Sequence, residues 1–183
     1  MLDEMDLMWI PVKKSWRLNE RYYGALQGLS KLETEAKYGK QQVHMWRRGY
    51  RDEPPAIDMA NKKVLAKDPR YGALEQSQLP LTESLEQTFL RLFPYWQEEI
   101  APDLRNGKKV FISSHGNTIR ALVKLLEQVN DKEIENVEIP TGIPLVYELD
   151  SDLSPVSKSY LRDSEDCARA IREGWSRPIP WKQ

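Results

Sequence analysis

The strongest constraint on the fold of this 183-residue sequence is a long apolar stripe followed by a short apolar run. The stripe consists of large apolar side chains at steps of three and four residues: Leu85, Phe89, Leu92, Trp96, Ile100 and Leu104. This spacing predicts an amphipathic helix that begins near Thr82 and ends at Asn106. Residues 109–114, Lys-Val-Phe-Ile-Ser-Ser, predict a buried strand, and a tight turn at His115 leads into another helix. Helices that alternate with strands indicate an α/β fold, in which helices cover a sheet on both faces.

The remaining patterns add shorter elements around this centre. Ser30 and Glu33 form a capping-box pattern, which predicts a helix over residues 31–38. Residues 49–81 are rich in proline and show little periodicity, which predicts a long loop. The other expected elements are, in chain order, a helix over 1–9, a strand over 12–17, a loop over 18–30, a helix over 40–48, a short helix capped by Asp131, strands over 143–149 and 155–160, a helix from Asp163 or Ser164 to Glu173, and a proline-rich tail over 175–183. We expect a single domain over residues 1–183.

Composition argues against several classes of function. The 27 basic and 28 acidic residues leave a net charge of −1, which does not suit a nucleic-acid-binding protein. No apolar run approaches the roughly 20 residues that cross a bilayer, and the acidic N-terminus does not resemble a signal peptide, so we expect no membrane partner. The single cysteine, Cys167, cannot form an internal disulfide or a Cys-based zinc site and favours a cytoplasmic location. With only two histidines, His44 and His115, we expect no metal centre.

His115 occupies a position that is suited to phosphate chemistry. It lies at the carboxyl end of the expected strand, immediately before a helix whose N–H groups and dipole attract anions. Gly116 lets a phosphate approach the backbone, and Asn117 can cap the helix. An imidazole there can donate a hydrogen bond to a phosphoryl oxygen or carry a proton. The alternative is a histidine that is merely hydrogen-bonded within the turn.

Two further segments could complete an anion site. Glu20 could act as a proton donor or acceptor, Arg21 offers a bidentate fork for phosphate, and Tyr23 offers a hydroxyl. The second segment is basic and contains Lys31, Arg47 and Arg48. Adjacent arginines at a helix end can clamp a small anion. The alternatives are a solvated loop with surface ion pairs for the first segment, and cations that stabilise a helix C-terminus for the second.

Taken together and in chain order, these segments resemble the 2,3-bisphosphoglycerate-dependent phosphoglycerate mutases. The most distinctive similarity is the run Ser15-Trp-Arg-Leu-Asn-Glu-Arg-Tyr-Tyr-Gly-Ala-Leu-Gln-Gly-Leu-Ser-Lys31. The other similar segments are Trp46-Arg-Arg-Gly-Tyr50, Asp68-Pro-Arg-Tyr71, Leu79-Pro-Leu-Thr-Glu-Ser-Leu85, His115-Gly-Asn-Thr-Ile-Arg120 and Pro140-Thr-Gly-Ile-Pro-Leu-Val-Tyr-Glu148. The resemblance covers nearly the whole chain and weakens after about Arg162.

The resemblance implies a three-layer α/β/α fold of the histidine phosphatase type and an isomerase of glycolysis and gluconeogenesis that interconverts 2- and 3-phosphoglycerate. In that family the phosphoryl group passes through a phosphohistidine that is primed by 2,3-bisphosphoglycerate, without a metal. By matching motif, Glu20 would be the general acid/base, and His115 would stabilise the transferring phosphoryl group. The substrate-binding residues would be Arg21, Tyr22, Tyr23, Lys31, Arg47, Arg48, Gly116 and Asn117.

The sequence departs from the family pattern at two places. Tyr22 stands where a histidine is common. The family begins with a strand that ends in Arg-His-Gly and carries the nucleophilic histidine, whereas this sequence contains no Arg-His-Gly. We therefore expect an N-terminally incomplete fold, in which the helix over 1–9 is the end of a cut helix. The loss of a central strand would expose unpaired backbone and apolar surface.

Three functions follow as hypotheses. The first is mutase chemistry on small phosphorylated acids, with the nucleophilic histidine supplied from outside this sequence. The second is a catalytically inactive chain that binds phosphorylated acids, or that forms a homo-oligomer or pairs with a full-length homologue through residues 1–16. The third is a histidine-type phosphatase of the same fold, which would hydrolyse other phosphate esters.

Overall fold

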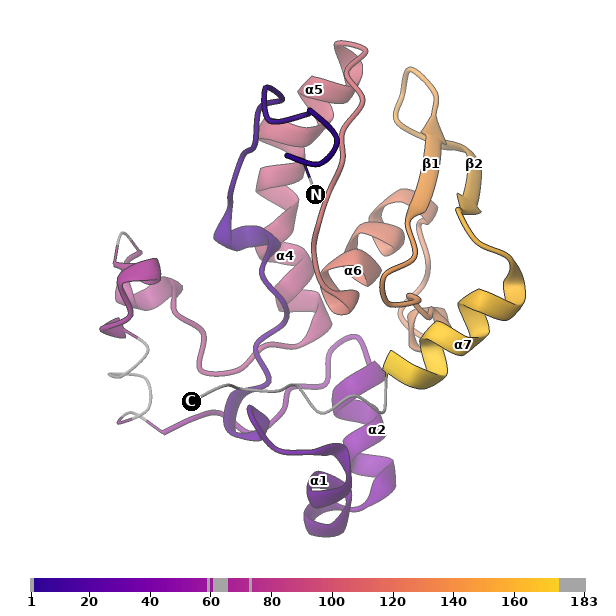
Figure 1. Cartoon of the computed structure of the whole chain (residues 1–183). Coiled ribbons are helices and arrows are strands. Elements are labelled where there is room, and N and C mark those ends of the chain that lie inside the picture. Colours follow the sequence, from indigo (N-terminus) through magenta and orange to yellow (C-terminus); the bar gives the residue numbers. More distant parts are fainter. Residues whose placement is uncertain (1, 59, 61–65, 73, 175–183) are drawn as a thin grey trace.

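In the computed structural model the described residues are 2–58, 60, 66–72 and 74–174, and they form helices beside one two-stranded sheet (Figure 1). The helices are α1 (Lys31–Tyr38), α2 (Lys40–Arg48), α4 (Leu85–Tyr95), α5 (Ala101–Arg105), α6 (Gly116–Glu127) and α7 (Ser164–Gly174). A π-helical turn over Trp96–Ile100 joins α4 to α5, and short 3-10 helices lie at Trp16–Leu18, Gly24–Leu26, Pro69–Tyr71, Gln76–Gln78 and Glu133–Asn136. The strands are β1 (Leu145–Leu149) and β2 (Pro155–Tyr160). The predicted tail over 175–183 and part of the predicted loop over 49–81 lie outside the described residues.

Helices α1 and α2 confirm the sequence prediction. The Ser30 hydroxyl accepts a hydrogen bond from the Glu33 N–H, and the Glu33 carboxylate accepts one from the Ser30 N–H, so the predicted capping box is present. Gly39, at φ 83°, separates the two helices because this left-handed region favours glycine. The C-terminal end of α2 carries Arg47 and Arg48 toward the middle of the molecule.

The N-terminal segment differs from the prediction. Residues 2–10 form successive turns rather than a helix, and no strand forms over 12–17. Met5, Met8 and Trp9 are 59%, 71% and 77% exposed, so most of the expected apolar face is open to solvent. A short helix without tertiary packing is only marginally stable in water, which accounts for the difference.

The long predicted helix consists of three parts rather than one. It begins at Leu85 instead of Thr82, because Ser84 and Gln87 form a second capping box that fixes the first turn. Pro94 has no N–H to donate, and the helix widens into the π-helical turn directly after it. The apolar stripe nevertheless remains buried from Leu92 through Ile100.

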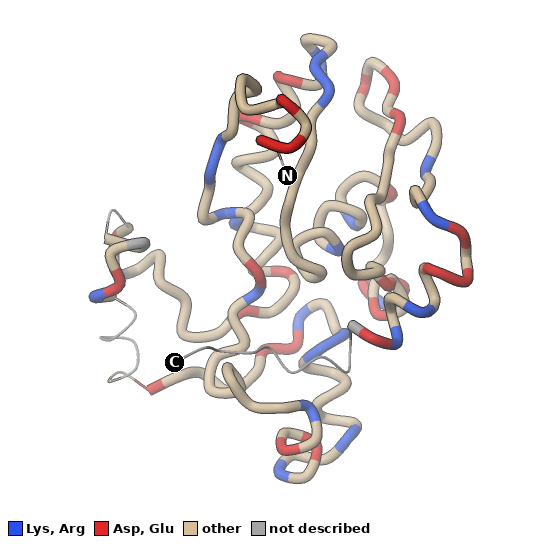
Figure 2. The backbone as a smooth tube through the Cα atoms, in the orientation of Figure 1, with Lys and Arg blue, Asp and Glu red and all other residues tan. Residues whose placement is uncertain are grey.

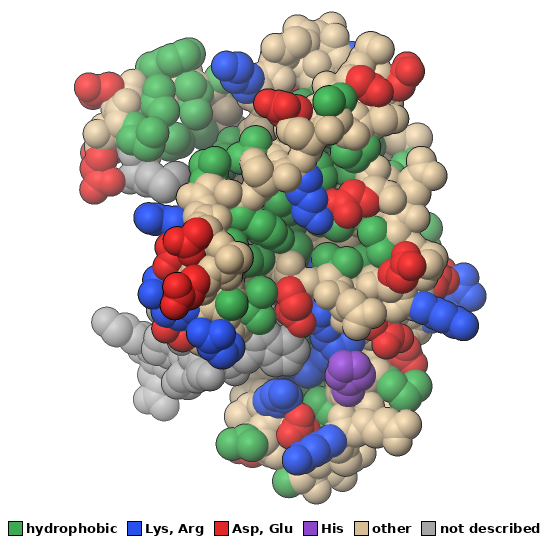
Figure 3. Space-filling model, turned by 90° about the vertical axis from the view of Figure 1, so that its right-hand side faces the viewer, with side chains coloured by type: hydrophobic (Ala, Val, Ile, Leu, Met, Phe, Trp, Pro, Cys, Tyr) green, Lys and Arg blue, Asp and Glu red, His purple; other side chains and the backbone are tan. Residues whose placement is uncertain are grey.

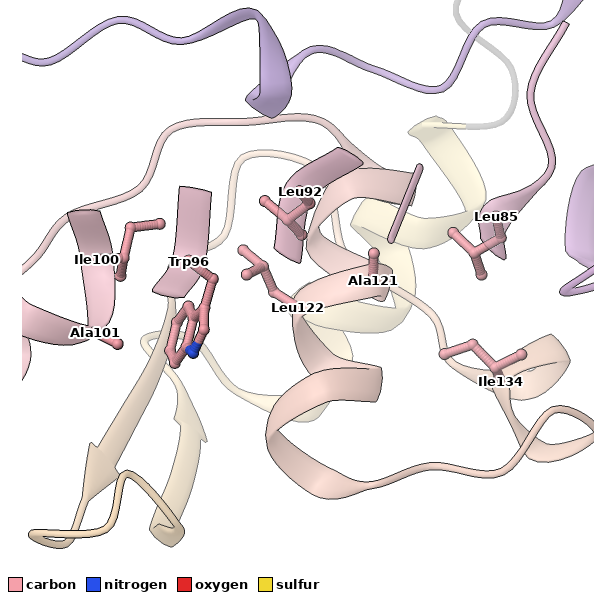
Figure 4. Close-up of a cluster of buried hydrophobic side chains, with 8 residues drawn as sticks. All are labelled: Leu85, Leu92, Trp96, Ile100, Ala101, Ala121, Leu122 and Ile134. Atoms are coloured by element: carbon pink, nitrogen blue, oxygen red, sulfur yellow. The ribbon is translucent and has the colours of Figure 1, made fainter. Parts of the chain in front are cut away.

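The core lies between this composite helix and α6 (Figure 4). Its buried members are Leu85, Leu92, Trp96, Ile100, Ala101, Ala121, Leu122 and Ile134. Leu85 and Leu92 are fully buried, and each such leucine contributes about 1.5–3 kcal/mol through removal of its surface from water. This packing fixes α6 against α4, and with it the helix start that carries the candidate site.

Residues 109–114 are the main correction to the predicted fold. The segment runs extended between α5 and α6 (Figure 1), but it pairs with no strand in the part of the chain that the structure describes. Val110 is 37% exposed and Phe111 is 73% exposed, and Ile112 alone of this run packs against the core. A strand becomes buried only when neighbouring strands and helices cover it, and none of the described elements does so here. The prediction of a buried strand is therefore wrong for this chain.

The C-terminal part agrees with the prediction except at two helix caps. The position before α6 belongs to His115 and not to Asn117, and the His115 side chain makes no capping hydrogen bond. Lys132 rather than Asp131 stands at the N-cap of the next short helix, and the Asn130 side-chain oxygen accepts from the N–H groups of Lys132 and Glu133. The two predicted strands form an antiparallel hairpin that pairs Leu145 with Tyr160, and α7 begins at Ser164 as expected.

The described residues thus contain both helices and strands, which is compatible with the predicted α/β class. None of the helices within the described ranges is long and apolar enough to cross a membrane.

Candidate anion-binding site

Three residues predicted for the site lie close to a fourth predicted residue, Tyr23. The guanidinium carbon of Arg21 lies 4.5 Å from the centre of the Tyr23 ring, and that of Arg47 lies 5.4 Å from it. The Asn117 side-chain amide donates to the Tyr23 hydroxyl at 3.0 Å. We call Arg21, Tyr23, Arg47 and Asn117 the Tyr23 cluster. Its members come from the loop before α1, the end of α2 and the start of α6, so three segments distant in the sequence converge.

Arg21 is the deepest member of this cluster. It is 1% exposed, and one of its nitrogens donates to the main-chain oxygen of Trp46 on α2. Its Nε and one Nη find no hydrogen-bond partner among the described residues. Because a buried donor without a partner costs free energy, this guanidinium favours a ligand that can accept hydrogen bonds.

Arg120 joins the site although the sequence did not point to it as a site residue. It is 2% exposed and donates to the Asn117 side-chain oxygen at 3.0 Å. It also donates to the main-chain oxygens of Arg47 at 3.4 Å and of Arg48 at 2.8 Å. The only local signal for this role is its spacing of three residues from Asn117 on one helix, which places both side chains on the same face.

Arg48 is buried but is turned toward acidic and carbonyl oxygens. Its guanidinium lies 2.9 Å from a Glu138 carboxylate oxygen and donates to the main-chain oxygens of Glu135 and Val137, each at 2.9 Å. The structure therefore gives Arg48 a part in joining α2 to residues 135–138, in addition to its place beside the predicted site.

Lys31 lies across an open hollow from the arginines of α2. The hollow has a volume of about 340 Å³ and is lined by Lys31, Glu35, Lys40, Gln41, Val43, His44, Arg47 and Arg48. The Lys31 ammonium is 3.6 Å from the Glu35 carboxylate. Arg47 and Arg48 lie in the last turn of α2, which borders both this hollow and the Tyr23 cluster, and Figure 2 marks the basic positions of the chain in blue.

Glu20 and His115 are brought to the same side of the molecule by two hydroxyl groups. Ser114 Oγ donates to the main-chain oxygen of Leu18, and Thr118 Oγ1 donates to that of Asn19, each at 2.6 Å. These bonds hold the segment before Glu20 against the start of α6. The Glu20 carboxylate accepts from the Arg21 N–H at 2.7 Å, while His115 and Gly116 are exposed. A Cβ at Gly116 would meet open space, so the backbone there is accessible to a ligand.

A buried ion pair, which the sequence did not predict, supports the loop that carries Glu20. Arg91 on α4 lies 2.6 Å from the carboxylate of Glu83 and donates to the main-chain oxygens of Arg17, Asn19 and Glu20. Glu83 also accepts from the Tyr22 N–H at 2.8 Å. The Tyr22 side chain itself is not part of the Tyr23 cluster, and burial together with nearby Tyr71 raises its pKa.

Gly24 lets the same loop pack closely against residues 54–55. Its φ is +58°, and a Cβ there would lie 2.2 Å from the Pro55 main-chain oxygen. That oxygen accepts from the Ala25 N–H at 2.8 Å. A larger residue at position 24 would therefore displace the loop that carries Glu20, Arg21 and Tyr23.

The electrostatics of the site are those of a concentrated positive charge. Burial, together with the nearby charges of Arg48 and Arg21, lowers the pKa of Arg120 to about 10. The acidic group that counteracts this shift is Glu138, which pairs with Arg48. An anion bound beside Arg21 and Arg47 would relieve this repulsion.

No known protein-family model matches this chain. Within residues 2–58, 60, 66–72 and 74–174, no three His, Cys, Asp or Glu side chains are grouped so that they could hold a metal ion.

Proposed function

We propose that this chain forms the phosphoglycerate-binding part of a 2,3-bisphosphoglycerate-dependent phosphoglycerate mutase, within a three-layer α/β/α fold of the histidine phosphatase type. The observation that supports this most is the convergence of Arg21, Arg47 and Asn117 on Tyr23. The residue chemistry and the family resemblance both point to these residues, and their convergence on one side chain supports a common site.

The proposed substrate suits the charges of the site. 2- and 3-phosphoglycerate each carry a phosphate and a carboxylate, and arginine guanidinium groups bind both in a bidentate manner. Arg21 has unpaired, buried N–H groups that such oxygens can accept from. Lys31 and Arg47 border the adjacent hollow and would bind the second acidic group.

The proposed roles in the reaction follow from position. Glu20 is held beside the start of α6 and would exchange a proton with a substrate hydroxyl. His115 is exposed at the N-terminus of α6 and would donate a hydrogen bond to the phosphoryl oxygens as negative charge develops on them.

The residues present also fit the proposed primer. 2,3-Bisphosphoglycerate, when bound, supplies the phosphoryl group that starts the exchange. Its two phosphates and one carboxylate need several cationic partners, and Arg21, Arg47 and Lys31 are the residues that would hold it. The sequence contains no Arg-His-Gly, so turnover on this scheme requires a nucleophilic histidine from outside the 183 residues.

A second candidate function is binding without turnover, in association with another chain. The observation that favours it is the exposure of apolar side chains in residues 1–16: Met5, Met8, Trp9 and Val12 are each more than half exposed. Apolar side chains also reach the surface over the face drawn in Figure 3. Such surface is typical of a protein interface, and it would suit a second copy of this chain or a full-length homologue.

Titration calorimetry with 3-phosphoglycerate tests the proposal. We expect the chain to bind it, and we expect Arg47→Met to weaken binding at least tenfold, because a charge-assisted contact is lost. The matched control is Arg169→Met on α7, whose charge pairs with Asp166 far from Tyr23 in the sequence. Absence of binding by the unmodified chain, or equal effects of the two substitutions, would overturn the proposal.

A coupled mutase assay tests the lack of a nucleophile, and sedimentation tests the second candidate. With 2,3-bisphosphoglycerate present, we expect no turnover by the purified chain, because the nucleophile is lacking. Turnover would contradict that assignment. If residues 1–16 form an interface, Trp9→Lys should lower the sedimenting mass of the chain alone or of its mixture with a full-length mutase. A monomer at all concentrations that does not associate with the mutase would exclude the second candidate.

A further inference from the structure

We infer that Arg120 is a positioning residue of this site, which fixes the Asn117 amide so that the Tyr23 hydroxyl directs its proton toward the bound anion. The inference rests on the proposed function, since it concerns the same site. Arg120 would not itself touch the substrate.

The orientation of Asn117 follows from its two neighbours. Arg120 carries only N–H donors, so the Asn117 atom 3.0 Å from its guanidinium must be the amide oxygen. The amide nitrogen is then left for the Tyr23 hydroxyl, to which it donates at 3.0 Å. Without Arg120, nothing in this chain of contacts would prevent the Asn117 amide from rotating by half a turn.

The orientation of Tyr23 follows in turn. A phenol has one proton to donate and can accept through its oxygen. Because the Asn117 amide occupies an acceptor position, the Tyr23 proton is available for a different partner. The Tyr23 ring lies close to the guanidinium groups of both Arg21 and Arg47, which would bind a phosphate or carboxylate. The hydroxyl proton and the cationic groups therefore serve the same ligand.

Arg120 also fixes the arginines of α2 through their main chain. The last carbonyl groups of a helix lack intrahelical partners, and Arg120 donates to those of Arg47 and Arg48. A third acceptor, the main-chain oxygen of Ile134, lies 2.6 Å away. One guanidinium thus joins the end of α2, the first turns of α6 and residue 134, which sets where the Arg47 side chain begins.

The burial of Arg120 supports a functional purpose for this arrangement. It is buried beside Arg48 and Arg21, and its Nε has no partner. A lysine could neutralise itself there more readily, and its single ammonium lacks a planar fork that spreads donors over separate nitrogens. The planar fork of Arg120 can orient one amide and three carbonyl groups together.

The experiment compares Arg120→Met and Arg120→Lys with Lys124→Met as the matched control. Lys124 is on the same helix and is also largely buried, but it donates to the Val129 main-chain oxygen and to Asp131, away from Tyr23. The first readout needs no ligand. In nitrogen-15 spectra, the Asn117 side-chain amide, identified by its absence in Asn117→Asp, should shift in both Arg120 variants and stay unchanged in Lys124→Met.

The second readout is the affinity for 3-phosphoglycerate. We expect Arg120→Met and Tyr23→Phe each to weaken binding about tenfold, and the double variant to be no weaker than the worse single one, because both remove the same donor. Arg120→Lys should recover less than half of the loss on a logarithmic scale. Multiplicative losses in the double variant, or an Asn117 amide signal that is unchanged in Arg120→Lys, would overturn the inference.

The two readouts keep the inference separate from the proposed function. If the unmodified chain binds no 3-phosphoglycerate, the proposed function fails. The Asn117 amide signal then decides whether Arg120 orients that side chain. If Arg120→Met does not fold, the Arg120→Lys spectrum and the cycle of Arg120→Lys with Tyr23→Phe give the same decision.

Discussion

Replacement of Arg91 by methionine should destabilise this protein severely, because Arg91 is the buried support of the loop that carries Glu20. Its side chain is 10% exposed and that of Glu83 is 6% exposed. The guanidinium binds the Glu83 carboxylate at 2.6 Å and the main-chain oxygens of Arg17, Asn19 and Glu20. Methionine has a similar length, so it fills the space but donates no hydrogen bond.

The magnitude follows from what remains after the substitution. The Glu83 carboxylate stays buried, and among the described residues the Tyr22 N–H is then the donor that remains to it. Removal of one partner of a buried ion pair costs about 3–5 kcal/mol, since the other charge is left uncompensated. A small domain has a free energy of unfolding of roughly 5–15 kcal/mol, so Arg91→Met should remove a large share of it. Arg91→Met combined with Glu83→Gln should lose less than Arg91→Met alone, because the unpaired charge is then absent.

Urea denaturation followed by tryptophan fluorescence measures this effect, and buried Trp96 in the core makes the signal sensitive to unfolding. Arg51→Met is the control, because its side chain is 71% exposed and its two ion pairs are solvated. We expect the control to change the free energy of unfolding by about 0.5 kcal/mol or less. A loss below about 1 kcal/mol for Arg91→Met, or a double variant less stable than Arg91→Met, would refute the reasoning.

Three further predictions concern the core, a cap and the extended segment. Leu92→Ala should cost about 2–5 kcal/mol in urea unfolding, because Leu92 is fully buried. Ser30→Ala should cost about 1 kcal/mol and raise the pKa of Glu33, which the Ser30 hydrogen bonds hold below its ordinary value of 4.5. In the unmodified chain, the stabilisation that these hydrogen bonds give to the ionised Glu33 carboxylate is present above about pH 4.5. It is lost as the pH falls through the lowered pKa of Glu33, and NMR titration of the carboxyl carbon would follow this change. Phe111→Ser should change the free energy of unfolding by about 0.5 kcal/mol or less, because Phe111 is 73% exposed. Replacement of a buried aromatic side chain typically costs roughly 3–5 kcal/mol, so a loss of about 3 kcal/mol or more would mean that the segment is covered in solution.

The sequence alone predicted those elements whose stabilising contacts are local. Both the capping box at Ser30 and Glu33 and the start of α7 at Ser164 depend on hydrogen bonds between residues that are three or four apart. The apolar stripe from Leu85 onward likewise needs no knowledge of the partner helix. Such patterns fix helix type and position before any tertiary contact forms.

Predictions failed where an element depends on distant partners. The segment over 109–114 has the composition of a buried strand, yet burial of a strand requires a neighbouring strand and a covering helix, which no local pattern supplies. The apolar helix expected over residues 1–9 failed for the same reason, since Met5, Met8 and Trp9 contact no core among the described residues.

The candidate site shows the same division. From the sequence came the residue types, Glu20, Arg21 and Tyr23 in one segment and Asn117 in another, together with the chemistry that they could perform. Only the tertiary structure decided that Tyr23 is the meeting point and that Arg91 and Arg120 hold the site together. The physical reason is that helix caps and stripes are set by neighbours in sequence, whereas a buried guanidinium finds its acceptors on segments that meet only when the core between α4 and α6 has formed.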